Sequence, residues 1–107
     1  MNNNLQTMMT AEKRSLLRNY ESLLRLAAKG TSYATADMIS KCLNTNPEDF
    51  RNSCKHQRDR IGFPVFTSGE ARQTVKIPIV PFIQWITGIQ TPTIYEAIEM
   101  VATGAIA

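Results

Sequence analysis

Residues 35–62 read TADMISKCLNTNPEDFRNSCKHQRDRIG and decide the fold. Capping residues and the spacing of apolar residues predict one helix over Thr35–Leu43 and a second over Pro47–Arg60. The residues between them, Asn44–Asn46, form a tight turn, since asparagine tolerates the left-handed backbone that such a turn requires. Gly62 then ends the second helix. The stretch therefore predicts two helices packed against each other across a short turn.

The two sides of the second helix differ in chemistry. Its inward side is predicted from steps of four, three and four residues, which join Phe50, Cys54, Gln57 and Ile61. Its outward side is basic and bears an amide. Four cations lie between residues 51 and 60 against a single acid: Arg51, Lys55, Arg58 and Arg60 against Asp59. Such a side suits contact with an anionic partner.

A hairpin and a closing helix are expected next. Phe63–Phe66 and Thr74–Ile77 are rich in aromatic and β-branched residues and predict two strands. The polar segment Thr67–Gln73 between them predicts the hairpin tip. Val80–Thr87 predicts an amphipathic helix that Gly88 ends, with core residues Phe82, Ile83, Trp85 and Ile86.

Further helices are predicted on both sides of this unit. Apolar residues at three- and four-residue spacings predict one continuous helix over about Thr10–Lys29. After Gly88, Thr91 is the expected cap and Pro92 the first residue of a short apolar helix. The fold class expected is mainly α with a small β-hairpin. Three parts are expected: an N-terminal helical arm (1–30), the central unit (31–88) and an apolar C-terminal helix (89–107).

Composition limits the class of protein. The chain has 107 residues, 43% of them hydrophobic and 20% charged, with a net charge of +3. It can therefore bury a core, and its charge is compatible with a nucleic-acid partner. No apolar run approaches the roughly 20 residues of a membrane span, and no signal-peptide pattern opens the sequence. A cytoplasmic, soluble protein without membrane contact is expected.

The sequence offers no recognisable catalytic or metal site. Cys42 and Cys54 lie on the apolar sides of their helices and are expected to be free thiols, with a disulfide between the helices as the alternative. His56, the single histidine, has no paired nucleophile or carboxylate at a recognisable spacing. No enzyme activity, small-molecule substrate, cofactor or metal is therefore expected.

The basic helix is the best candidate site. A helix that follows a short turn and precedes a hairpin is the order found in a winged helix-turn-helix, whose second helix enters the DNA major groove. Residues in its first half can reach base edges, and later cations can contact phosphates. The expected DNA-binding residues are Arg51, Asn52, Lys55, His56, Arg58 and Arg60 on the helix, and Arg72 and Gln73 near the hairpin tip. The plain alternative is a solvated cationic surface.

A resemblance to a known family rests on particular segments. Ala34–Ile39 opens the first helix, and the turn and Pro47 come next. These are followed by Gly62–Phe66, the polar loop, and the strand and helix from Val75 to Trp85. This order resembles the small winged-helix proteins of the excisionase and MerR-like superfamily. It is most similar to the phage-derived pyocin activator proteins. The resemblance implies base contacts from Arg51, Asn52 and Lys55 and a hairpin contact from Arg72.

The functional expectation is a sequence-specific protein of a phage or mobile element that binds double-stranded DNA as transcriptional regulator or excisionase. A homodimer or higher oligomer is expected, with two recognition helices about 34 Å apart on DNA. The alternative is a protein-binding adaptor or inhibitor that keeps the winged fold and captures a partner through its apolar terminal helices. Asp59 and Glu70 favour that alternative, since carboxylates near phosphates are repulsive.

Overall fold

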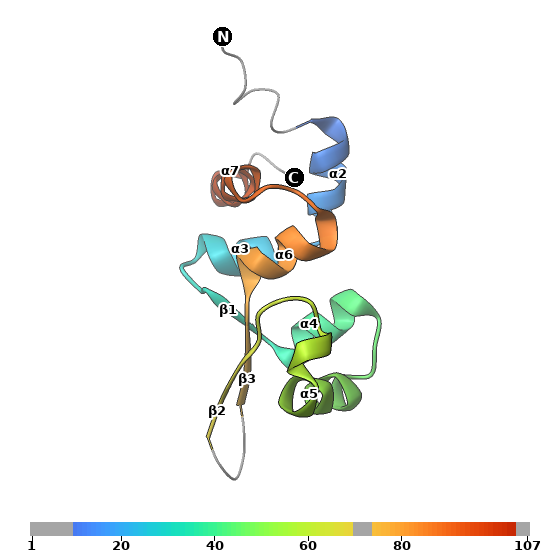
Figure 1. Ribbon diagram of the computed structural model, residues 1–107. Helices are drawn as coiled ribbons and strands as arrows, with labels where there is room; N and C mark the ends of the chain where they lie inside the picture. Colours follow the sequence, from blue (N-terminus) through green and yellow to red (C-terminus); the bar gives the residue numbers. More distant parts are fainter. Residues whose placement is uncertain (1–9, 70–73, 105–107) are drawn as a thin grey trace.

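Residues 10–69 and 74–104 are described by the computed structural model, and they fold into helices that lie at one end and on one side of a small antiparallel sheet (Figure 1). The order along the chain is α2 (Ala11–Arg18), α3 (Glu21–Ala28), β1 (Tyr33–Thr35), α4 (Ala36–Leu43), α5 (Pro47–His56), the 3-10 helix η1 (Arg58–Arg60), β2 (Phe66–Ser68), β3 (Thr74–Pro78), α6 (Ile79–Thr87) and α7 (Thr91–Ala102). The expected class, mainly α with a small hairpin, is confirmed at this level.

The prediction of one continuous N-terminal helix was wrong. The chain leaves the helical conformation at Tyr20, whose φ is −116° and ψ 27°, so that α2 and α3 run in different directions (Figure 1). Tertiary packing accounts for the break, because the Tyr20 ring meets the ring of Phe82 edge-on at 6.5 Å between centroids. Leu17 on α2 and Leu24 on α3 are both fully buried.

The second helix of the central unit ends earlier than predicted. Gln57 was expected on the inward side, but it is exposed and has a φ of −134°, which ends α5 after His56. Residues Arg58–Arg60 form the separate turn η1. The change of direction brings Phe63 and Val65 into the core, where each is at most 8% exposed.

The sheet has three strands in the order β1-β3-β2, all antiparallel. The sequence did not predict β1, which pairs Ala34 with Ile77 of β3. The first hairpin strand was expected at Phe63–Phe66, either as an edge strand or beginning just after Pro64; β2 is an edge strand and begins at Phe66, paired with Lys76. Pro64 has no N–H to donate to a ladder, so the pairing starts only after it. The strand predicted at Thr74–Ile77 is confirmed and includes Pro78 as well.

One hydrophobic core joins the helices to the inner face of the sheet. Phe82 is the largest fully buried side chain of the described residues, and its ring centroid lies 5.0 Å from that of Phe63. Trp85 was predicted in the core but is 47% exposed, although its ring lies 5.0 Å from that of Phe63. Its position on α6 places the indole at the edge of the core, above the chain at Gly62.

The C-terminal helix α7 packs against α3 and α6 and buries Ile94 and Ala97. Gln90, rather than Thr91, occupies the position before the helix, and the Thr91 hydroxyl donates to the Gln84 side-chain oxygen at 2.9 Å. Within the described residues, no helix has both the length and the apolar character needed to cross a membrane.

Candidate nucleic-acid interface

Two helices and a short turn hold the candidate interface. The Thr35 hydroxyl accepts a hydrogen bond from the Met38 N–H at 3.2 Å and caps α4, as predicted. Asn44 ends α4 in the left-handed conformation, with φ 57° and ψ 44°, which confirms its predicted role. The Thr45 N–H then donates to the Ser40 carbonyl at 3.0 Å, so the turn satisfies backbone groups at the end of the helix.

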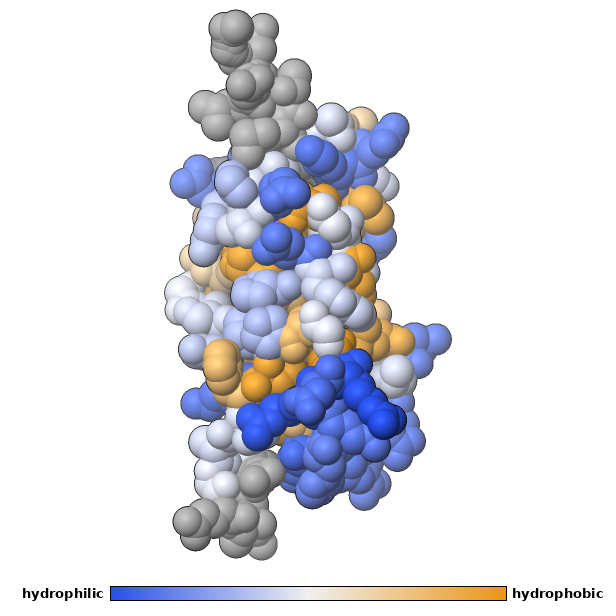
Figure 2. Space-filling view, in the orientation of Figure 1, coloured by the Kyte–Doolittle hydropathy of each residue, from blue (hydrophilic) through white to orange (hydrophobic). Residues whose placement is uncertain are grey.

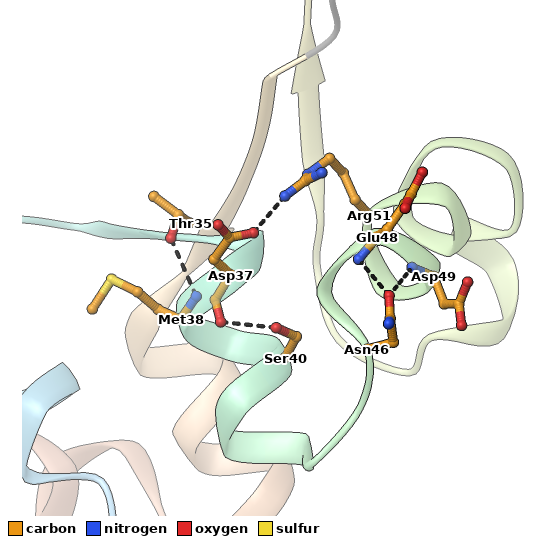
Figure 3. A network of polar contacts seen from close by, with 8 residues as sticks. All are labelled: Thr35, Asp37, Met38, Ser40, Asn46, Glu48, Asp49 and Arg51. Carbon is orange, nitrogen blue, oxygen red and sulfur yellow. Dashed lines mark hydrogen bonds and ion pairs between the residues drawn. The ribbon is translucent and has the colours of Figure 1, made fainter.

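The start of α5 is fixed by its cap. The Asn46 side-chain oxygen accepts hydrogen bonds from the N–H groups of Glu48 at 2.9 Å and Asp49 at 3.1 Å (Figure 3). Pro47 occupies the first turn, where its missing N–H costs nothing. Two acidic side chains in this turn complement the helix dipole. The sequence predicted this arrangement correctly, and it gives α5 a defined position relative to α4.

The two sides of α5 divide as their residue types require. Phe50 and Cys54 are buried against the core, while Asn52 and His56 are exposed. Arg51 and Lys55 are half-buried, on the boundary between the two sides. Arg58 and Arg60 are exposed, but on η1 and not on the α-helix itself.

Polar side chains gather on one end of the surface. Figure 2 shows a strongly hydrophilic area over α5 and η1, bordered above by hydrophobic surface. In the figure this area is the most extensive deep-blue region of the visible face. Most of the predicted site residues lie on α5 and η1, so they belong to this polar area.

Arg51 is engaged by a residue that the sequence did not predict as part of the site. Its Nη2 donates to Oδ1 of Asp37, the second residue of α4, across the boundary between the helices (Figure 3). The Arg51 side chain is 39% exposed and that of Asp37 59% exposed, so the pair lies at the surface. The sequence contained a signal for this pair. Asp37 is an acid in the first turn of one predicted helix, and Arg51 is a base on the next helix, across a short turn.

The hairpin lies at the same end of the molecule as α5 (Figure 1). The predicted tip residues Arg72 and Gln73, and Glu70, lie outside the described residues. The outer face of the sheet presents Lys76 on β3, which is exposed and was not among the predicted site residues. In a strand, neighbouring residues point to opposite faces, so the position of Lys76 between the apolar residues Val75 and Ile77 could have predicted that it lies on the outer face.

The cysteines are free and have little nucleophilic character. Burial raises the pKa of the Cys54 thiol to about 11 and also raises the pKa of Cys42. A thiol with such a pKa is protonated near neutral pH, whereas nucleophilic attack and metal binding need the thiolate. Among the residues that the structure describes, no three His, Cys, Asp or Glu side chains are grouped so as to hold a metal ion.

Comparison of the chain with protein-family models, curated proteins and solved structures finds no match. The geometry of α4, α5, η1 and the hairpin is therefore the basis for a functional proposal.

Proposed function

We propose that this chain is a sequence-specific DNA-binding protein that uses a winged helix-turn-helix, with α5 as the helix that enters the major groove. The observation that carries the proposal is the α4–turn–α5 unit. Its second helix is fixed at the start by the Asn46 cap, buries Phe50 and Cys54, and exposes Asn52 and His56. An α-helix with an exposed polar side fits the width of the major groove of B-DNA.

Base reading belongs to the first half of α5. Arginine can donate two hydrogen bonds to O6 and N7 of guanine, and asparagine can bind N6 and N7 of adenine. Arg51 and Asn52 are adjacent there and accessible at the surface. They are the residues that we propose discriminate between sequences.

Phosphate contacts belong to the later cations. Arg58 and Arg60 are exposed on η1, directly after the helix, and Lys55 lies on its boundary. Contacts to phosphate fix the position of a protein on the duplex but carry no sequence information. The β2–β3 hairpin, at the same end of the molecule, is proposed to meet the flanking DNA with Arg72 and Gln73.

The biological role proposed follows from the resemblance to excisionases and pyocin activators: regulation of transcription, or excision, in a phage or mobile element. We propose that the chain acts as a homodimer on a repeated site. Two copies of α5 would then meet successive major grooves about 34 Å apart.

The test is selection from a library of random DNA duplexes, followed by sequencing of the retained molecules. The full chain is expected to enrich one motif, and Arg51→Ala/Lys55→Ala is expected to lose it. Both altered side chains are half-buried and neither belongs to the hydrophobic core, so circular dichroism should show a folded variant. Equally weak binding by the two proteins, without enrichment, would contradict the proposal.

One observation favours a second candidate, a protein-binding adaptor. Large apolar side chains are exposed on the terminal helices, Leu16 on α2 and Tyr95 on α7. Tyr33 and Phe66 are also exposed on the outer face of the sheet, with their rings edge-on at 6.1 Å between centroids. The salt dependence of binding separates the two candidates. Affinity for DNA falls steeply with added salt, because salt reduces the free energy gained when the protein releases counterions from the DNA. Binding through aromatic side chains would change little between 50 and 200 mM salt, values that bracket the steep range for DNA.

A further inference from the structure

We infer that Asp37 is a specificity-determining residue: it pairs with Arg51 and directs that guanidinium toward a base edge and away from phosphate. The inference rests on the proposed function and assigns a role to a residue of α4. It starts from the ion pair between Asp37 Oδ1 and Arg51 Nη2, which joins α4 to α5 at the surface (Figure 3).

The pair restricts the Arg51 side chain without using all of its donors. A guanidinium has five N–H groups in a fixed planar arrangement. The bond to Asp37 comes from Nη2, and no other side-chain partner of Arg51 is present within the described residues. The remaining donors are therefore available to an acceptor pair such as O6 and N7 of guanine. A side chain already held loses less conformational freedom on binding.

The pair also changes the kind of acceptor that Arg51 prefers. A lone arginine is attracted to any phosphate, but a carboxylate beside it cancels the net charge of the pair and repels a phosphate. A neutral base edge carries no such penalty. Asp37 should thus lower the affinity of this end of the molecule for DNA in general and increase its discrimination between sequences.

The first turn of α4 is built to keep Asp37 in place. Thr35 caps the helix through the Met38 N–H, and the Ser40 hydroxyl donates to the Asp37 carbonyl oxygen at 2.8 Å. Ser40 is fully buried. These bonds hold the backbone at Asp37, so the carboxylate starts from a defined position next to α5.

The experiment compares Asp37→Asn with the full chain and with Asp49→Asn as the matched control. Both variants remove one negative charge near the start of a helix, but Asp49 forms no ion pair within the described residues. Affinity is measured for the enriched duplex and for a scrambled duplex. Asp37→Asn should bind the scrambled duplex more tightly, with a salt slope steeper by about one phosphate contact. Its discrimination should fall about tenfold, within the range expected for one arginine–guanine contact.

A single-atom change in the DNA gives a second measurement, the loss of affinity when the contacted guanine lacks N7. A purely structural role of Asp37 would not change this loss. Replacing the contacted guanine by 7-deazaguanine removes the N7 acceptor. The full chain and Asp49→Asn should lose affinity, and Asp37→Asn should lose much less. Unchanged discrimination in Asp37→Asn, or an equal loss in Asp49→Asn, would overturn the inference while leaving the proposed function intact. Absence of any enriched motif for the full chain would overturn both.

Discussion

The molecule has two halves that are stabilised differently. The helical half, defined as α2, α3, α6 and α7, holds most of the fully buried apolar side chains. Its C-terminal helices carry little charge, none on α6 and only Glu96 and Glu99 on α7, whereas α2 and α3 together carry six charged residues. The polar half, defined as α4, α5, η1 and the sheet, has nine charged residues between positions 36 and 60. Side-chain caps and ion pairs occur in both halves: Thr10 caps α2 and Arg25 pairs with Glu21 in the helical half, and Asn46 caps α5 and Arg51 pairs with Asp37 in the polar half. The difference indicates that the helical half provides most of the buried apolar packing, while the polar half carries the site that we propose binds DNA.

Phe82 joins the two halves. On α6 it meets Tyr20 of the helical half at 6.5 Å between ring centroids and Phe63, next to the polar half, at 5.0 Å. Phe82→Ala should lower the free energy of unfolding by about 3–5 kcal/mol, since it removes a fully buried ring and leaves a cavity. Chemical denaturation followed by far-UV circular dichroism measures this loss.

Phe66→Ala is the matched control, because the same truncation falls on a side chain that is 51% exposed. It should change stability far less. A single unfolding transition in Phe82→Ala would show that the halves remain one cooperative unit. Two separate transitions, where the unchanged chain shows one, would mean that the Phe82 ring is what couples the two halves.

The junction between the halves can be tested at Gly62. This residue has a φ of +90°, and an added Cβ would lie 2.8 Å from Nε1 of Trp85. Gly30 has a similar φ of +94° with nothing within 4 Å of its added Cβ. Gly30→Ala should therefore cost about 1–2 kcal/mol for the left-handed backbone alone. Gly62→Ala should cost roughly 1 kcal/mol more for the displaced indole, the lower end for overpacking.

Trp85 is the single tryptophan of the chain, so its fluorescence reports the displacement directly. The emission should shift in Gly62→Ala and stay unchanged in Gly30→Ala. Equal stability losses and identical spectra in the two variants would show that the indole does not lie against Gly62 in solution.

The smallest effect expected compares caps in the two halves. Asn46 caps α5 through two N–H groups, whereas Gln90 precedes α7 without a side-chain cap. Asn46→Ala should destabilise the protein by about 1 kcal/mol. Gln90→Ala should change stability by less than about 0.5 kcal/mol. Thermal denaturation of both variants measures the two effects, and equal effects would contradict a stabilising role for the Asn46 cap.

Local signals in the sequence predicted much of the polar half. Thr35, Asn44 and Asn46 act at helix ends where their side chains suit the backbone, and their roles are confirmed. Elements that depend on distant partners were not predictable in this way. The strand β1 exists because β3 pairs with it from about forty positions along the chain, and three residues carry no periodicity of their own.

The same limit applies to individual side chains. The helical pattern is interrupted at Tyr20, whose ring packs on Phe82. This break depends on a tertiary contact that the local sequence does not reveal. For Asp37, the sequence offers Lys41 four residues later as a helical partner, yet the structure pairs it with Arg51 on the next helix. Trp85 is a large apolar residue type on an apolar helix, as expected of a core residue, but it lies at the edge of the core. Which of two suitable partners a side chain meets depends on helix packing, so the candidate site was predicted by residue type and not by geometry.

The short outer strands of the sheet have a consequence for behaviour at high concentration. β1 and β2 contain three residues each and flank the longer β3 on both sides. A strand edge that brief offers few free backbone groups to a neighbouring molecule, which is how natural proteins limit edge-to-edge aggregation. The sheet can therefore carry exposed aromatic side chains on its outer face without providing a template for fibril growth.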